Sequence, residues 1–220
     1  MYKLLFFIAA FTLMTFESLG ETPRKTAELN PAALFTDIKN LTSDLELINK
    51  AMNSTVYISG RFVQYAPDGS VMFGNLFIKR PGKLRIEYDS PYSLLIVSDG
   101  ISLIQKDIKL GTTDRISLSS TPIYYFLKKD INLIKDVKVT SLIKKENEWY
   151  ISITDSTDDS IGDLTIILDA IKLTIKGWNI VDGSGNATYV KLTDIVYPNN
   201  LNPRLFLTRE ESRRSKKRNR

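Results

Sequence analysis

Hydrophobic and polar residues alternate along residues 72–100, in three short segments separated by turn-forming residues. The side chains of a β-strand point alternately to the two faces of its sheet, so this pattern predicts three consecutive strands. Pro81-Gly82 predicts the first turn, because proline lacks an amide donor and glycine permits a positive φ. One face of the predicted strands is almost wholly apolar and carries Leu76, Ile78, Leu84, Ile86 and Tyr88. Arg80 ends the first strand on that same face, which places a cation beside an apolar surface.

The same alternation continues on both sides of these three strands. Further strands are predicted at residues 56–65, 101–108, 115–118, 137–144, 148–154, 163–169, 172–181, 187–196 and 205–207. Short strands at regular spacing favour a meandering antiparallel sheet. A long sheet curls, and one with an apolar concave face half-closes into a barrel. The sequence therefore predicts a mainly β protein of the α+β class, a curved antiparallel half-open β-barrel of about ten to eleven strands.

A segment with a helical period precedes the strands. From position 34 to position 52 its apolar residues are spaced by three and four, which makes one apolar stripe. These residues are Leu34, Ile38, Leu41, Leu45, Ile48 and Met52. Ser43 and Glu46 have the form of a capping box, so two helices with a bend near Asn40 are an alternative to one helix. Taken alone, the stripe favours an ordinary core helix, and a lid over a cavity is the alternative.

A second, short helix is predicted behind Thr121-Pro122, because proline is favoured at the first position of a helix. Large apolar residues follow without interruption, among them Ile123 and Phe126. A helix that is apolar nearly all round needs cover on more than one side.

The two ends of the chain predict export and a basic extension. An apolar run over residues 4–14 is short for a transmembrane helix, and Ser18-Leu19-Gly20 has the form of a cleavage site. We predict a signal peptide at residues 1–20, with an uncut anchor as the alternative, and a flexible lead at residues 21–30. Residues 209–220 hold seven basic and two acidic residues, a surplus equal to the net charge of +5. The tail is predicted to be disordered, and the neutral body argues against a nucleic-acid partner.

The composition removes most routes to catalysis. The chain has no cysteine and no histidine, which excludes thiol and imidazole nucleophiles, disulfides, and thiolate or imidazole metal sites. No phosphate-binding loop, GxSxG or SxxK motif is present. The densest acidic cluster has the turn composition of a solvated hairpin, which we favour over a cation site. It consists of Asp155, Asp158, Asp159 and Asp163. We predict no catalytic residues, no metal site and no cofactor.

Three pieces of the central region carry a family resemblance. Phe77-Ile-Lys-Arg-Pro-Gly-Lys, Arg85-Ile-Glu-Tyr and Ile96-Val-Ser-Asp-Gly resemble motifs of the LolA family of periplasmic lipoprotein carriers. Further pieces resemble that family in the same order, over residues 56–207: Gly60-Arg-Phe-Val-Gln, Thr121-Pro122, Asp182-Gly-Ser-Gly-Asn-Ala-Thr and Leu205-Phe206. The chain departs from the family at Ile104-Gln105-Lys106, where aromatic residues are common, so we expect a less aromatic wall there.

The resemblance implies a domain at residues 31–208 in which a helical lid covers an apolar cavity. In this family the arginine of the KRP motif is understood to hydrogen-bond the lid backbone, which would make Arg80 the lid latch. Its partners would lie within residues 31–52 or 121–127. From the residues alone, Arg80 would instead sit at a strand end and reach solvent. The acyl-binding cavity implied by the resemblance is formed by Leu45, Ile48, Leu76, Ile78, Leu84, Ile86, Tyr88, Ile123 and Phe126.

The function implied by the resemblance is that of a monomeric periplasmic chaperone and not of an enzyme. It would receive acylated lipoproteins from an inner-membrane lipoprotein-releasing ABC transporter and carry them to an acceptor at the outer membrane. A binding module for another lipid or amphiphile, such as a glycolipid or an envelope-stress ligand, is the alternative on the same fold. An enzyme on this scaffold is a second alternative, which the missing catalytic motifs disfavour.

Overall fold

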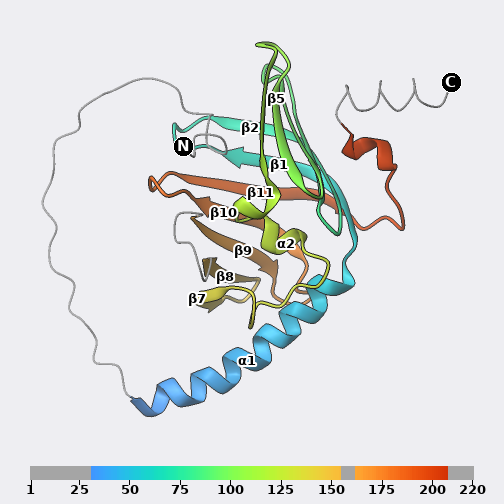
Figure 1. Ribbon diagram of the computed structural model, residues 1–220. Coiled ribbons are helices and arrows are strands. Elements are labelled where there is room, and N and C mark those ends of the chain that lie inside the picture. Colours follow the sequence, from blue (N-terminus) through green and yellow to red (C-terminus); the bar gives the residue numbers. More distant parts are fainter. Residues whose placement is uncertain (1–30, 155–161, 208–220) are drawn as a thin grey trace, which may run out of the picture.

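Eleven antiparallel strands form one sheet in the computed structural model of the chain, and the sheet is not closed (Figure 1). Their order is β6-β5-β4-β3-β2-β1-β11-β10-β9-β8-β7, so neighbours in the sheet are neighbours in the chain except where β1 meets β11. The strands are β1 (Tyr57–Tyr65), β2 (Val71–Lys79), β3 (Lys83–Tyr88), β4 (Leu94–Asp99), β5 (Ser102–Asp107), β6 (Thr112–Ser117), β7 (Lys138–Lys144), β8 (Glu148–Thr154), β9 (Asp163–Asp169), β10 (Ile175–Val181) and β11 (Ala187–Val196). The predicted half-open barrel is confirmed.

The structure describes residues 31–154 and 162–207, with side chains from residue 40 onward. The predicted signal peptide (1–20), lead (21–30) and basic tail (209–220) lie outside these ranges, as do Asp155, Asp158 and Asp159 of the acidic cluster. Those predictions stay predictions. Within the described ranges, no helix has both the length and the apolar character needed to cross a membrane.

Two α-helices and two short 3-10 helices accompany the sheet. The α-helices are α1 (Pro31–Ser54) and α2 (Tyr124–Leu127), and the 3-10 helices are η1 (Leu118–Ser120) and η3 (Pro203–Phe206). The short helix predicted behind Pro122 is confirmed as α2. The alternative of a bend near Asn40 is wrong, because α1 is one continuous helix. Neither proline nor glycine occurs at residues 32–54 to interrupt its backbone hydrogen bonds.

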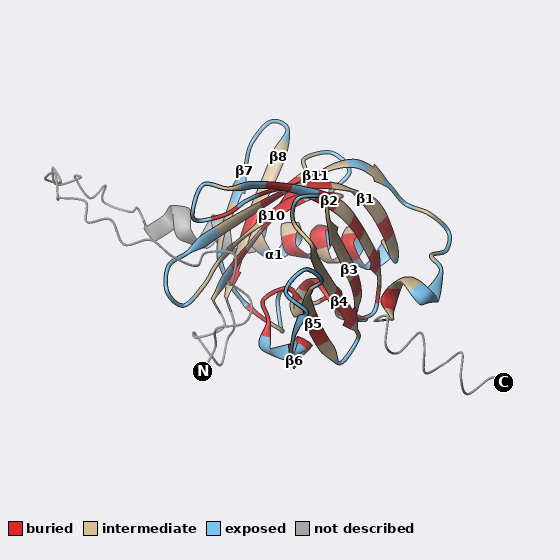
Figure 2. Ribbon diagram, turned by 90° about the horizontal axis from the view of Figure 1, so that it is seen from above, coloured by how far each residue is buried: buried red, intermediate tan, exposed pale blue. Residues whose placement is uncertain are grey.

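The main core lies between α1 and the inner face of the sheet. Leu45, Ile48 and Met52 of α1 belong to the same buried cluster as Phe62 of β1 and Leu76 of β2. Figure 2 shows the sheet curving from β7 round to β6, with α1 on the inner side of the curve. The apolar stripe of the helix is therefore buried against the apolar stripes of the strands, each side chain contributing about 1.5–3 kcal/mol.

The structure differs from the predicted elements at three places. The strand predicted at residues 115–118 is β6, which begins at Thr112 and ends at Ser117, and Leu118 begins η1. Residues 205–207 belong to η3 and not to a strand, because Pro203 cannot donate a ladder hydrogen bond and the Asn202 side chain accepts from the Arg204 amide at 3.0 Å. Phe206 is instead buried beside β3 and β4. The strand predicted at residues 172–181 begins at Ile175, because the Asp169 carboxylate accepts from two amides of the preceding turn.

Candidate functional site

Arg80 follows β2 directly and is buried with only 6 % of its surface exposed. The solvent-reaching position that the residues alone favoured is wrong, since the alternation of β2 carries Arg80 to the inner side with Leu76 and Ile78. Burial lowers the pKa of Arg80 from its ordinary value, and the nearby Asp130 carboxylate offsets part of this effect. A guanidinium stays protonated under these conditions, so the interior holds a charged group that must be hydrogen-bonded.

The Arg80 guanidinium connects two segments that are far apart in the chain. At the end of α1 it donates to the carbonyl oxygens of Met52 and Thr55 and, at 3.0 Å, to Asn53 Oδ1. Behind α2 it donates to the carbonyl oxygens of Lys128, at 2.9 and 3.0 Å, and of Lys129, at 3.1 Å. Both segments lie in regions where the resemblance placed the lid or directly follow them.

The acceptors suit a cation although every one of them is neutral. The last carbonyl groups of a helix have no partner within the helix, and the helix dipole places partial negative charge there. Met52 and Thr55 lie at this end of α1, so the unpaired carbonyl groups and the dipole of the helix both favour a cation at the position of Arg80. The planar fork of five donors lets one side chain serve both segments at once.

The turns on either side of β3 and β4 pack tightly beside Arg80. Gly82 has φ +73°, and a Cβ atom there would lie 2.6 Å from the Cα atom of Gly100. The buried Ser98 hydroxyl donates to the Gly82 carbonyl oxygen at 2.7 Å, and the Gly82 amide donates to the Leu127 carbonyl oxygen at 2.8 Å. The KRPG and SDG motifs are therefore neighbours in space, and together they fix the end of α2.

Two asparagines of α1 form a second connection between the helix and residues 128–137, which we call the lid loop. Asn53 donates to the Ile131 carbonyl oxygen at 2.8 Å and accepts from the Ile131 amide at 2.9 Å. Asn49, one helical turn earlier, accepts from the Leu133 amide at 2.9 Å. Sequence reasoning missed both residues. The available signal was two amides, spaced by four, along the border of the apolar stripe.

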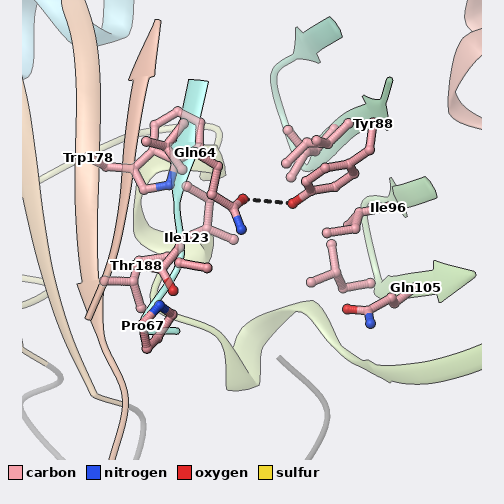
Figure 3. Close-up of a pocket in the computed structure, with 14 residues that line it drawn as sticks. Gln64, Pro67, Tyr88, Ile96, Gln105, Ile123, Trp178 and Thr188 are labelled. Carbon is pink, nitrogen blue, oxygen red and sulfur yellow. Dashed lines mark hydrogen bonds between the residues drawn. The ribbon is translucent and has the colours of Figure 1, made fainter. Parts of the chain in front are cut away.

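A cavity of about 90 Å³ lies inside the curve of the sheet (Figure 3). Its apolar lining comes from five strands, the β1–β2 turn and the residue before α2: Ala66, Pro67, Leu84, Ile86, Ile96, Leu103, Ile123, Trp178, Ile180 and Val190. Its polar lining consists of Gln64, Tyr88, Gln105 and Thr188. The volume is well below the roughly 300–1,000 Å³ of common ligand pockets.

The predicted cavity residues fall into two groups. Leu84, Ile86, Tyr88 and Ile123 line the cavity. Leu45, Ile48, Leu76, Ile78 and Phe126 are buried in the core that surrounds it and do not line it. Trp178 of β10 faces the cavity from the opposite wall and was missed, because alternation alone does not distinguish a cavity wall from ordinary core.

A hydrogen-bonded pair crosses the cavity. The Tyr88 hydroxyl donates to Gln64 Oε1 at 2.7 Å, as Figure 3 shows. Burial raises the pKa of Tyr88 above its ordinary value, so the phenol is neutral. Its ring meets Phe62 edge to face at 5.2 Å between centroids. Gln105 stands at the position where the sequence predicted a less aromatic wall, and it lines the cavity from β5.

Comparison with known proteins agrees with the resemblance. The family model described as "Outer membrane lipoprotein carrier protein LolA" matches residues 53–209. An outer-membrane lipoprotein carrier protein of Pseudomonas aeruginosa is 28% identical over 158 residues, which are 68% of this chain and 73% of that protein. One of Nitrosomonas europaea is 32% identical over 96 residues, 40% of this chain and 44% of that protein.

Other matches are more limited. An uncharacterized protein of Rickettsia prowazekii is 26% identical over 104 residues, 47% of this chain and 49% of that protein. The chain thus spans about half the length of two of these relatives. The crystal structure of a LolA superfamily protein from Nitrosomonas europaea superposes with a TM-score of 0.44 at 11% identity, covering 74% of this chain and 97% of that one.

Proposed function

The chain belongs to the LolA family, and we propose that it is a periplasmic carrier of lipoproteins and not an enzyme. In this proposal it is a monomer that receives acylated lipoproteins from an inner-membrane lipoprotein-releasing ABC transporter. It holds their acyl chains in the cavity and delivers them to an acceptor at the outer membrane. The observation that carries the proposal is the position of Arg80, which ties α1 and the lid loop together beside an apolar cavity.

The energies of closing and loading are of similar size. A hydrogen bond to a charged group contributes about 1.5–3 kcal/mol. The several Arg80 hydrogen bonds would therefore together stabilise the closed lid by a few times this amount. Burying one methylene contributes about 0.8 kcal/mol, and a full acyl chain therefore contributes on the order of 10 kcal/mol. Burial of an entering acyl chain can offset the loss of the Arg80 hydrogen bonds. When these hydrogen bonds form again, they favour release of the acyl chain. Such a carrier needs no ATP of its own, since differential affinity sets the direction of transfer.

The test is transfer of an acylated lipoprotein from spheroplasts into the soluble fraction by purified mature protein. We expect the wild type to release the lipoprotein and pass it on, and Arg80→Leu to load it without passing it on. Arg61→Leu is the matched control, because Arg61 pairs with Asp89 while 39% of its side chain is exposed. The proposal is wrong if the wild type releases no lipoprotein, or if both variants behave alike.

The polar lining of the cavity favours a second candidate on the same fold. Gln64, Tyr88, Gln105 and Thr188 give the cavity more hydrogen-bonding groups than a hydrocarbon chain requires. A carrier of another amphiphile, such as a glycolipid or an envelope-stress ligand, would use them. Mass spectrometry of material that copurifies with the protein separates the two candidates, since a triacylated polypeptide supports the lipoprotein carrier and a free lipid supports the alternative.

A further inference from the structure

The cavity is sealed at one end and reaches the surface at the other. β1 runs between these ends, from Tyr57, which pairs with Lys79 beside the latch, to Tyr65, which pairs with Val71 at the β1–β2 hairpin. At the latch end Ser98 and Leu127 are completely buried. At the hairpin end the lining includes Pro67, which is exposed. A ligand therefore has its way in at the hairpin end, with the latch at the far end.

Three of the four polar groups of the lining lie toward the open end. Gln64 is the last but one residue of β1, Tyr88 is the last residue of β3, and Thr188 lies near the start of β11 beside the same hairpin. Leu84 and Leu103 lie nearer the latch, where Leu84 pairs with Ser98 and Ser98 with Leu103. The cavity thus has a polar mouth and an apolar floor, the arrangement expected for an amphiphile that enters tail first.

Gln64 stands out within this mouth because it is 93% buried and only half of its amide is engaged. Its Oε1 atom accepts the hydroxyl of Tyr88. Its Nε2 atom has no hydrogen bond to any described residue, and in Figure 3 it points into the cavity. Among the described residues only the Ser70 hydroxyl is a fully buried side-chain polar atom without a hydrogen bond, so the Nε2 atom of Gln64 is open to the cavity, where an acceptor from outside the chain can reach it.

The charge of the lining narrows the chemistry of that acceptor. Among the described residues, none that lines the cavity is charged. A carboxylate or phosphate drawn to this depth would lose its water without meeting a cation, which is unfavourable. A neutral carbonyl oxygen accepts from an amide at little cost, and esters and amides of fatty acids carry one at the head of each chain.

We propose that Gln64 Nε2 donates to the ester or amide carbonyl of a bound acyl chain, whose tail extends past Leu84 and Leu103 toward the latch. This inference rests on the proposed function, because it assumes that the cavity binds acyl chains. Gln64 is the residue that recognises the carbonyl. Tyr88 is a positioning residue, since its hydroxyl holds Oε1 and so turns Nε2 into the cavity. The site distinguishes an acyl chain from a plain hydrocarbon chain and from a free fatty acid anion.

Two lysophospholipids provide a matched test, measured by displacement of an environment-sensitive naphthylamine dye. One carries a palmitoyl ester, and the other carries a hexadecyl ether with the same chain and head group but no carbonyl. We expect wild type to bind the ester about five- to tenfold more tightly, and Gln64→Met to bind the two alike while its ether affinity stays within about twofold of wild type. Gln105→Met makes the same chemical change on a half-buried wall residue and should keep the preference for the ester.

The possible outcomes separate a failure of the role proposed for Gln64 from a failure of the proposed carrier function. Equal binding of ester and ether by wild type, or an ester preference that survives in Gln64→Met, overturns the inference and leaves the carrier proposal standing. Binding of neither lysolipid overturns both. If Gln64→Met does not fold by circular dichroism, Tyr88→Phe carries the test, because it frees Gln64 to rotate and should reduce the ester preference without abolishing ether binding.

Discussion

Arg80 and Gln64 are both buried polar side chains, and they differ in how far their hydrogen bonds are completed. Arg80 is charged, and it donates to oxygens at the end of α1 and in the lid loop. Gln64 is neutral, and the described residues engage its oxygen and not its nitrogen. A buried side chain whose donors are all hydrogen-bonded within the protein fixes the structure around it. A side chain with a free donor can instead bind another molecule. In the two proposals above, closing the lid and recognising a ligand are thus separate tasks at opposite ends of one cavity.

The largest expected effect comes from removing the completed group. Arg80→Leu should lower the free energy of unfolding in urea by about 2–4 kcal/mol, because several buried carbonyl groups lose their donor. The variant should still fold, since domains of this kind are commonly stable by about 5–15 kcal/mol. Arg61→Leu should change the value by less than about 1 kcal/mol, as expected for an exposed pair. Equal losses in the two variants would contradict the distinction drawn for Arg80.

A smaller effect is expected at alkaline pH, where the Tyr88 phenol of the pair can ionise. Burial raises the pKa of Tyr88 in the folded protein, while in the unfolded chain it titrates near its ordinary value of 10.0. Above that pH the unfolded state loses the proton and the folded state keeps it, so stability falls as the pH rises. Urea unfolding at several pH values should show a steeper alkaline loss in wild type than in Tyr88→Phe. Parallel pH profiles would show that Tyr88 does not contribute.

The smallest effect concerns the pair as a unit. Gln64→Met leaves the Tyr88 hydroxyl without its acceptor and should cost about 1 kcal/mol of unfolding free energy. The double variant Gln64→Met, Tyr88→Phe replaces both partners with apolar groups and should return to within about 0.5 kcal/mol of wild type. The double-mutant cycle measures this coupling directly. A double variant whose loss equals the sum of the two single losses would show that the pair is not coupled.

The sequence predicted the central strands well because each is bounded by a strong turn. Residues 83–88 alternate between Pro81-Gly82 and Ser90-Pro91, and β3 has those bounds in the structure. The last predicted strand was wrong because an apolar pair near Phe206 resembles a short strand, while Pro203 and the Asn202 cap favour a 3-10 helix. Local patterns thus decide an element reliably only when its boundary residues agree with its interior.

The candidate site was harder to predict, because its contacts join distant parts of the chain. The acceptors of Arg80 lie between 25 and 49 residues away, so the alternation of β2 could place the arginine on the inner face but could not supply its partners. Alternation also shows which face of the sheet a side chain points to, but it does not show whether that position packs in the core or lines the cavity. Ile78 and Ile86 share the inner face, yet Ile78 is packed in the core and Ile86 lines the cavity.

The open sheet has a mechanical consequence for loading. β6 and β7 are consecutive in the chain but stand at opposite edges of the sheet, and within the described residues neither is paired on its outer side. The connection between them, residues 118–137, contains α2 and the lid loop, so it works as a strap across the gap. In the proposed carrier, spreading the two edges would enlarge the interior without breaking any ladder hydrogen bond. The connection, which Arg80 bonds through the carbonyl oxygens of Lys128 and Lys129, would limit how far the edges can spread.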